Sequence, residues 1–196
     1  NGWKTDRRMI VVNFKRYVSG ELAVELAKLC KKYGVIACPQ ITDLAACVET
    51  GVECWTQKYE PQAVGHAGTL LNHSDYPLTE EVLNAQCLML KKFTKCICVN
   101  SLEEAIRVAK LRPDFIAYEP HELIGNKEKS VSSERPEEIR RIVLNTKCSI
   151  LIGAGVHSAK DVKIALEMGA RGVLVATDIV KAVDPEKELR ELVEAF

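Results

Sequence analysis

The chain has 196 residues, which is enough for one domain with a sizeable core and too few for two full ones. Its 27 Lys and Arg residues balance 27 Asp and Glu residues, so no basic excess is present to neutralise nucleic-acid phosphates. No segment has the apolar length that a membrane-spanning helix needs. We therefore expect a globular, cytoplasmic protein that binds neither nucleic acid nor membrane.

The first residues stand apart from the rest of the sequence. Residues 1–8 lack the apolar core of a signal peptide, and Met9 resembles a natural start. We expect residues 1–8 to be an N-terminal extension or residues added in cloning, and residues 9–196 to form a single domain.

Eight cysteines are spread along the chain without a C-x-x-C pair or a histidine at metal-ligand spacing. Most of them lie in apolar runs, where a thiol behaves as a small hydrophobic group. We therefore expect buried free thiols in a reducing compartment, and no metal site.

Short apolar runs rich in β-branched residues alternate with helical patterns along the chain. The runs are continuous rather than alternating, which is typical of parallel strands buried on both faces. The predicted strands are 9–14, 35–38, 52–56, 69–72, 96–100, 115–119, 149–153 and 173–176.

Several helices carry start signals between these strands. Ser101 and Ser158 are each followed three residues later by an acidic residue, the spacing of a capping box. Pro136 and Pro185 stand where a first helical turn begins. Strands alternating with helices fit either an open doubly wound sheet or a closed barrel, and periodicity alone does not choose between them.

The interval between the third and fourth predicted strands is unusually short. A crossover between parallel strands takes about a dozen residues and usually contains a helix. Residues 58–67 contain Pro and Gly and have room for one or two turns at most. The third β/α unit is therefore predicted to be truncated.

Polar side chains follow several predicted strands, at the end where the active site of a β/α barrel lies. An amide, a cation, an imidazole and a carboxylate stand at these ends: Asn13, Lys15, His73 and Glu119. Small-residue loops at 153–155 and 176–178 follow the last two strands. Such loops expose backbone N–H groups that can hold a phosphate.

Several motifs resemble those of triosephosphate isomerase, in the short form typical of archaea. They occupy residues 12–15, 71–74, 117–125, 153–156 and 172–176, in the order and spacing of that family. The resemblance runs from about Met9 to the C-terminus. It implies an α/β fold, a (β/α)8 TIM barrel, here with a truncated third β/α unit.

The resemblance also implies a reaction, the interconversion of dihydroxyacetone phosphate and D-glyceraldehyde 3-phosphate through an enediolate. Glu119 would move a proton between neighbouring carbons, and His73 would donate a hydrogen bond to the developing enediolate oxygens. In this family a neutral imidazole is known to polarise the carbonyl. Lys15 would supply positive charge, and Asn13 would orient Lys15 and the substrate.

The family also has a mobile lid, which here would be residues 120–134 and would exclude water. Backbone groups at five positions would hold the phosphate: Ile124, Gly125, Gly155, Ala176 and Thr177. The only partner expected is a small phosphorylated triose. No metal or organic cofactor is implied, since the substrate carbonyl itself acidifies the neighbouring C–H.

Three departures from the family pattern bear on activity and assembly. Asp75 stands where the family usually has Glu, and Asp178 brings a negative charge toward the phosphate loops. The loop after the third strand normally inserts into a neighbouring subunit, so its shortening predicts a monomer or an altered oligomer.

These departures leave a second hypothesis open, a phosphate-binding TIM-barrel scaffold with weak or no isomerase activity, such as a loop-deleted variant. A different isomerase or an aldolase is a third, but a Schiff-base aldolase needs a mid-barrel lysine that no predicted strand provides. We interpret His66, His121 and His157 as loop or surface residues and Trp55 as a packing residue.

Overall fold

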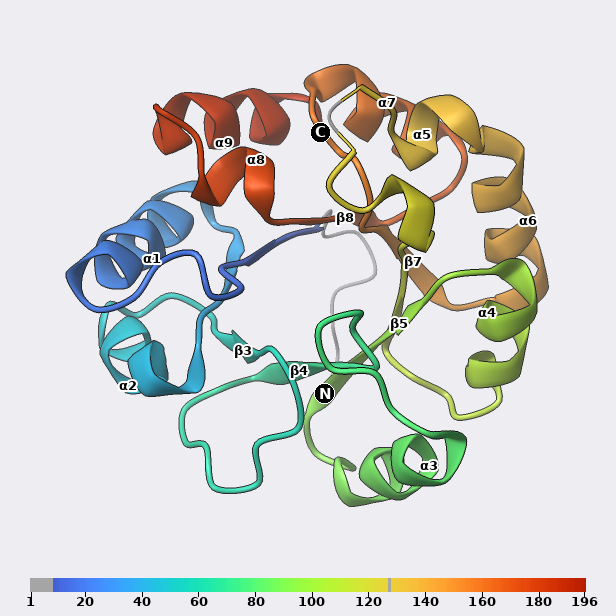
Figure 1. The fold of residues 1–196 in the computed structure, drawn as a ribbon, viewed down its shortest axis with the longest axis horizontal. Helices are drawn as coiled ribbons and strands as arrows, with labels where there is room; N and C mark the ends of the chain where they lie inside the picture. Colours follow the sequence, from blue (N-terminus) through green and yellow to red (C-terminus); the bar gives the residue numbers. More distant parts are fainter. Residues whose placement is uncertain (1–8, 127) are drawn as a thin grey trace.

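A ring of parallel strands surrounded by helices makes up the part of the chain that the computed structural model describes, residues 9–126 and 128–196 (Figure 1). The predicted extension at residues 1–8 lies outside this part. The strands are β1 (Met9–Asn13), β2 (Ile36–Cys38), β3 (Trp55–Thr56), β4 (Gly68–Leu71), β5 (Thr94–Val99), β6 (Phe115–Tyr118), β7 (Ser149–Ile152) and β8 (Gly172–Val175). Each predicted strand is confirmed in position, which fixes an α/β architecture.

The strand order shows that the sheet closes into a barrel rather than lying open. Strands are hydrogen-bonded in the order β2-β1-β8-β7-β6-β5-β4-β3, so β1 pairs with β8. A single parallel bridge between Ala37 and Cys54 joins the two remaining edges. β3 is shorter than predicted because its pairing toward β2 is limited to that bridge. The predicted (β/α)8 barrel is confirmed.

Alternating side chains of the strands face either the barrel interior or the helices, and both sets are apolar. The interior set is one packed cluster: Met9, Val11, Ile36, Cys38, Trp55, Leu70, Cys96, Cys98, Phe115, Ala117, Leu151 and Leu174. Trp55 is fully buried there, its ring centroid 5.7 Å from that of Phe115, which confirms it as a packing residue. Burial on both faces explains the continuous apolar runs.

Helices form the outer layer and return the chain from one strand to the next. They are α1 (Glu21–Tyr33), α2 (Ile41–Glu49), α3 (Glu80–Met89), α4 (Leu102–Ala109), α5 (Val131–Glu134), α6 (Pro136–Thr146), α7 (Ala159–Glu167), α8 (Thr177–Val180) and α9 (Pro185–Glu194), with a 3-10 turn η1 (His121–Leu123). None of the helices within residues 9–126 and 128–196 is long and apolar enough to cross a membrane.

The predicted helix caps form, with one difference from the expected geometry. The side chains of Ser101 and Ser158 accept hydrogen bonds from the backbone N–H groups of Glu104 and Asp161. The return bonds go one residue further back than in a capping box. The Glu104 carboxylate accepts from the N–H of Asn100 at 2.9 Å, and that of Asp161 from the N–H of His157 at 3.1 Å.

The connection between β3 and β4 contains turns and bends but no helix, in contrast to its neighbours (Figure 1). This connection covers residues 57–67. The ring of His66 stacks on that of Phe93 at a centroid distance of 4.6 Å, which places it outside the barrel. In the third β/α unit a loop therefore takes the place of the helix that connects the strands in the neighbouring units.

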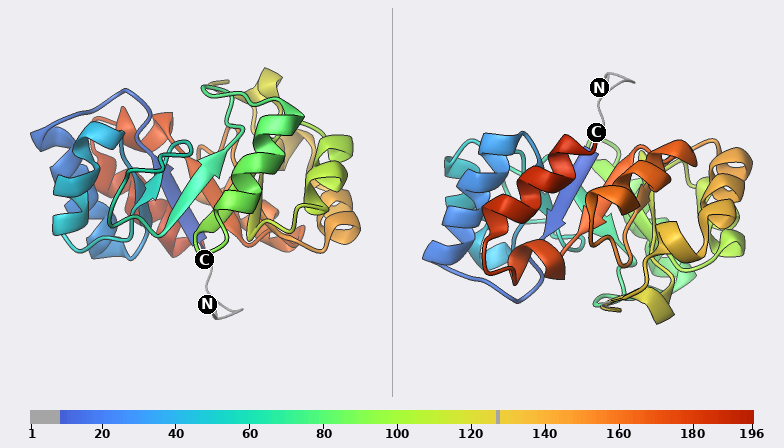
Figure 2. Two further views of the ribbon diagram at one scale, coloured as in Figure 1. Left: turned by 90° about the horizontal axis from the view of Figure 1, so that it is seen from below. Right: turned by 90° about the horizontal axis from the view of Figure 1, so that it is seen from above.

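Loops at one end of the barrel build the functional region. Figure 2 shows that the segment after β4 and the segment after β6 project from the same end, opposite the C-terminus. This is the carboxyl end of the strands, where β/α barrels place their sites.

Candidate active site

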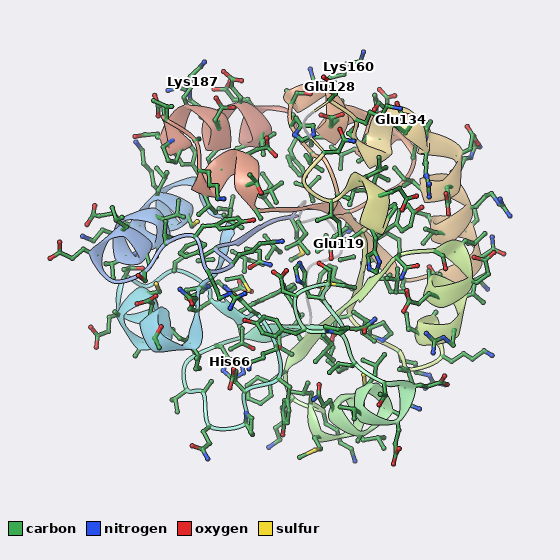
Figure 3. All side chains as sticks on the ribbon, in the orientation of Figure 1. His66, Glu119, Glu128, Glu134, Lys160 and Lys187 are labelled. Carbon is green, nitrogen blue, oxygen red and sulfur yellow. The ribbon has the colours of Figure 1, made fainter. Side chains whose placement is uncertain are left out.

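A cleft at the carboxyl end of the barrel collects every residue that the sequence suggested for the site. Its lining includes Asn13, Lys15, His73, Glu119, Ile124, Gly125, Gly155, Ala176 and Thr177. Figure 3 shows Glu119 near the middle of the ring, and His66 displaced toward the β3–β4 connection. The parallel strands bring these residues together because each lies at or just beyond a strand end.

Glu119 directly follows β6 and is 5% exposed. Its backbone N–H donates to the carbonyl of Val99 at 2.8 Å, which extends the pairing of β6 with β5 and fixes where the side chain begins. Its Oε2 atom is buried and has no hydrogen-bond partner among the described residues. Burial raises the pKa of this carboxyl, while the neighbouring His73, Cys98 and Lys15 oppose that rise without cancelling it. A desolvated carboxylate without a partner is a strong base.

His73 faces Glu119 from the end of β4, with Nε2 3.7 Å from Oε1 of Glu119. The other ring nitrogen, Nδ1, lies 3.1 Å from the backbone N–H of Asp75. Because that N–H can only donate, Nδ1 accepts, and a neutral ring then carries its proton on Nε2. The N–H of the imidazole is thereby placed on the side of the ring that faces Glu119 and the cleft.

Lys15 is held at the cleft by its backbone. It adopts a left-handed conformation with φ 48°, which costs free energy in a residue with a Cβ. The Asn13 side-chain oxygen accepts from the Lys15 N–H at 2.9 Å, and the Gln57 amide donates to the Lys15 carbonyl at 2.9 Å and to the Cys38 carbonyl at 3.2 Å. These bonds stabilise the strained turn. The Lys15 ammonium lies 3.4 Å from the Asp75 carboxylate.

Gln57 is a site residue that the sequence did not identify. It is 8% exposed and joins the turn after β1 to the end of β2. The available signal was an amide directly after a strand, the position that Glu119 occupies after β6. Its contact with Lys15 spans 42 positions and could not be inferred from local pattern.

The segment after β6 is tied at both ends. The Arg135 guanidinium pairs with the Glu122 carboxylate and lies 3.4 Å from the Tyr118 hydroxyl, so the two ends of residues 120–134 meet. The Val131 N–H donates to the carbonyl of Ala154 at 3.2 Å. The described residues of this segment are therefore anchored to the barrel at both ends.

Gly155 fits closely against this segment. It has φ +64°, and a Cβ on it would overlap the Lys129 carbonyl oxygen and lie 2.9 Å from the Ser130 Cα. The loop after β7 and residues 129–130 therefore touch backbone to backbone. This contact places the N–H groups around Gly155 at the cleft.

The opposite wall of the cleft starts with the short helix α8. The first N–H groups of a helix have no partner within it, and those of Thr177 and Asp178 stand beside the Gly155 loop. Asp178 has a basic neighbour there, since its carboxylate lies 3.0 Å from Nδ1 of His157. His157 is indeed a loop residue, but the sequence did not place it in the cleft, and the structure does.

Comparison with known proteins agrees with this architecture. The sequence profile of the family described as triosephosphate isomerase matches residues 85–196. A triosephosphate isomerase of Thermoplasma volcanium is 36% identical over 94% of this chain and 98% of its own length, and one of Methanothermus fervidus is 35% identical over 96% and 98%.

A solved structure with the same fold is the thiamine phosphate pyrophosphorylase of Pyrococcus furiosus, with a TM-score of 0.71 at 17% identity, covering 97% of this chain and 96% of that one. At that identity the likeness concerns the fold alone. The sequence relatives are much closer and nearly coextensive with this chain. The chain therefore belongs to the triosephosphate isomerase family.

Proposed function

We propose that this chain interconverts dihydroxyacetone phosphate and D-glyceraldehyde 3-phosphate, with Glu119, His73, Lys15 and Asn13 as the reacting and orienting groups. The observation that carries this assignment is the buried Glu119 carboxylate, which has one unpartnered oxygen and faces the Nε2 atom of His73 in the cleft. A base and a hydrogen-bond donor on either side of one space suit proton abstraction next to a carbonyl.

The reaction moves one proton between neighbouring carbons and one proton between the oxygens that those carbons carry. Glu119 takes a proton from the carbon next to the carbonyl, and the electron pair of that C–H bond shifts so that the carbonyl oxygen gains negative charge. The Nε2–H of His73 donates to that oxygen and stabilises the enediolate. The substrate hydroxyl gives up its proton and the former carbonyl oxygen gains one. Glu119 returns its own proton to the neighbouring carbon, which completes the exchange of aldehyde and ketone.

Positive charge and free N–H groups hold the phosphate end of the substrate. The Lys15 ammonium, 14% exposed, points to the same cleft as the loops at Gly155 and Thr177. A partly desolvated cation interacts more strongly with a dianion than a fully hydrated one. Ile124, Gly125 and Ala176 complete the proposed phosphate contacts.

An enzyme-coupled assay on the purified protein tests the proposal. We expect turnover in both directions, and calorimetry should show binding of 2-phosphoglycolate, an analogue of the enediolate. Binding without turnover would instead support a phosphate-binding scaffold. Of the three features that motivated the scaffold hypothesis, Asp75 and Asp178 each lie beside a basic side chain, and the third is the shortened loop after β3.

Gly153 offers a test of how closely the base must be placed. A Cβ at this position would overlap Cγ of Glu119 and lie 2.8 Å from its Cδ, so Gly153→Ala has to displace the carboxylate. A shift of about 1 Å can cost roughly 100-fold in rate, and we expect a fall in kcat of that order. Steady-state kinetics with a thermal melt is the measurement. Gly20→Ala is the control for kcat: it has open space around its Cβ but a φ of +60°, so it should lower Tm without changing kcat. Wild-type kcat in Gly153→Ala would refute the placement.

We further propose that the chain does not form a dimer through the loop after β3. Residues 57–67 contain no helix, and the alignment with the Thermoplasma relative spans 210 positions, more than the 196 residues of this chain. Both observations support loss of the inserting loop. Light scattering over a concentration series should show a monomer or an assembly that does not use this segment. A tight dimer abolished by substitutions in residues 58–67 would contradict the proposal.

The state of the cysteines indicates whether the protein works in a reducing or an oxidising compartment. All eight are free, and seven of them are buried. Burial raises the pKa of the Cys47 thiol to about 11, which keeps it in the unreactive neutral form. Such thiols support the proposal of a reducing, cytoplasmic location.

A further inference from the structure

Two ionisable side chains that the proposed mechanism does not use meet at the phosphate end of the cleft. His157 follows β7, and Asp178 lies in the first turn of α8, after β8. Nδ1 of His157 is 3.0 Å from Oδ1 of Asp178, and both residues line the same cleft as Lys15 and Glu119. Their distance is that of a hydrogen bond between partly buried groups, 23% and 41% exposed.

The charges around the cleft show why this pair matters. Among the described residues that line the cleft, Lys15 is the only lysine or arginine, while Glu119 and Asp178 are both acidic. A phosphate group that carries two negative charges adds to that excess. A carboxylate at Asp178 without a cation would repel it, because charges of like sign at short range disfavour binding. A protonated His157 supplies the missing positive charge.

The hydrogen bonds of His157 indicate what its protonation would do. The backbone N–H of His157 donates to the Asp161 carboxylate at 3.1 Å, and Nδ1 lies 3.0 Å from the Asp178 carboxylate. The remaining ring nitrogen, Nε2, is buried and has no partner among residues 9–126 and 128–196. In the neutral ring with its proton on Nδ1, Nε2 is a buried acceptor without a donor. In the protonated ring it becomes a donor that an anion can satisfy.

We infer that His157 and Asp178 form a proton-linked determinant of phosphate affinity, in which binding of the phosphorylated substrate is coupled to protonation of His157. The inference rests on the proposed phosphate site. The pair sets how strongly the substrate is held, and it leaves the proton transfer to Glu119.

Other charged groups face His157 from each neighbouring element. Asp161 and Lys160 of α7 and Glu128 of the lid segment line an outer cleft together with His157. The charged side chains that line this outer cleft beside His157 are thus two carboxylates, of Asp161 and Glu128, and one ammonium, of Lys160. The Asp161 carboxylate is also held by the hydroxyls of Ser130 and Ser158. Acidic groups therefore outnumber the basic one around this imidazole.

The test compares KM, kcat and their pH dependence in the wild type, His157→Gln and the double variant His157→Gln/Asp178→Asn. In His157→Gln the Asp178 carboxylate loses its cation, and we expect KM to rise roughly 5- to 20-fold at pH 6.5 with a much smaller change in kcat. The double variant removes both charges and should recover most of the lost affinity. The pH profile of the double variant also shows the effect of ionisation of the substrate's own phosphate group. This effect is the same for all the proteins.

Calorimetry supplies a readout that does not depend on turnover. Binding of 2-phosphoglycolate in buffers of different ionisation enthalpy measures proton uptake, and the wild type should take up more protons near pH 7.5 than His157→Gln does. Glu119 is present in both proteins, so its contribution cancels. His66→Gln is the matched control, since His66 stacks on Phe93 away from the cleft, and it should match the wild type.

The outcomes separate this inference from the proposed function. Equal KM, pH profile and proton uptake in the wild type and His157→Gln would overturn the inference even if the enzyme is fully active. Proton-linked binding without any turnover would support the inference and refute the isomerase assignment. A rise in KM and a fall in kcat, together with a lower Tm in both variants, would indicate a structural role and would also overturn it.

Discussion

Replacing Glu119 by glutamine should lower kcat by roughly 10²- to 10⁴-fold while the barrel stays folded. The substitution keeps the size of the side chain and removes its ability to take a proton. Because 2-phosphoglycolate is held mainly at its phosphate end, its binding should fall far less than turnover. The coupled assay, calorimetry and circular dichroism measure the three quantities. Activity that survives the substitution unchanged would exclude Glu119 as the base.

The raised pKa of Glu119 adds two dependences on pH. The carboxylate form is the base, so kcat/KM of the wild type should fall as pH decreases through the raised pKa, above the ordinary value of 4.5. The buried neutral form contributes stability that is fully present below pH 4.5 and is lost as pH rises through the raised pKa. Glu119→Gln should therefore be more stable than the wild type at neutral pH, and the difference should vanish below pH 4.5.

Glu167→Gln is a matched control for both measurements. Glu167 is exposed at the end of α7 and lies outside the lining of the cleft. Neither its turnover nor its pH profile should differ from the wild type. A stability of Glu119→Gln equal to that of the wild type at every pH would show that the carboxylate is better solvated than its burial indicates.

Gly172→Ala should produce the largest loss of stability. Gly172 begins β8 opposite Met9 of β1, and a Cβ there would overlap the Met9 carbonyl oxygen and lie 2.7 Å from its carbonyl carbon. These are backbone atoms of a paired strand, so relief requires β1 and β8 to separate. We expect a loss on the order of 3 kcal/mol or more in the free energy of unfolding, which corresponds to roughly 6–12 °C in Tm.

Gly34→Ala distinguishes this steric effect from backbone strain. Gly34 ends α1 with φ +67° and has no atom within 4 Å of its Cβ position. Its substitution should cost only the strain of the left-handed conformation, about 1–2 kcal/mol. Denaturant unfolding of the two variants measures the difference. A Gly172→Ala variant no less stable than Gly34→Ala would show that the β1–β8 pairing adapts without cost.

Local patterns in the sequence were sufficient for the elements and for the residues at their ends. The apolar runs predicted every strand because a strand buried on both faces has little choice of composition, as β8 shows. Glu119 and His73 could be identified because each stands at or next to the end of such a run. In a barrel of parallel strands the carboxyl ends gather at one rim, so position along the chain determines position in space.

What the sequence by itself determined is therefore the strands, most helix starts and the group Asn13, Lys15, His73 and Glu119. Only the tertiary structure decided the closure of the ring at Ala37 and Cys54, the support of Lys15 by Gln57, and the pairing of His157 with Asp178. The physical reason is the range of the interactions. Strand and cap signals act within a few residues, whereas each of these contacts joins different β/α units and exists only when the barrel has closed.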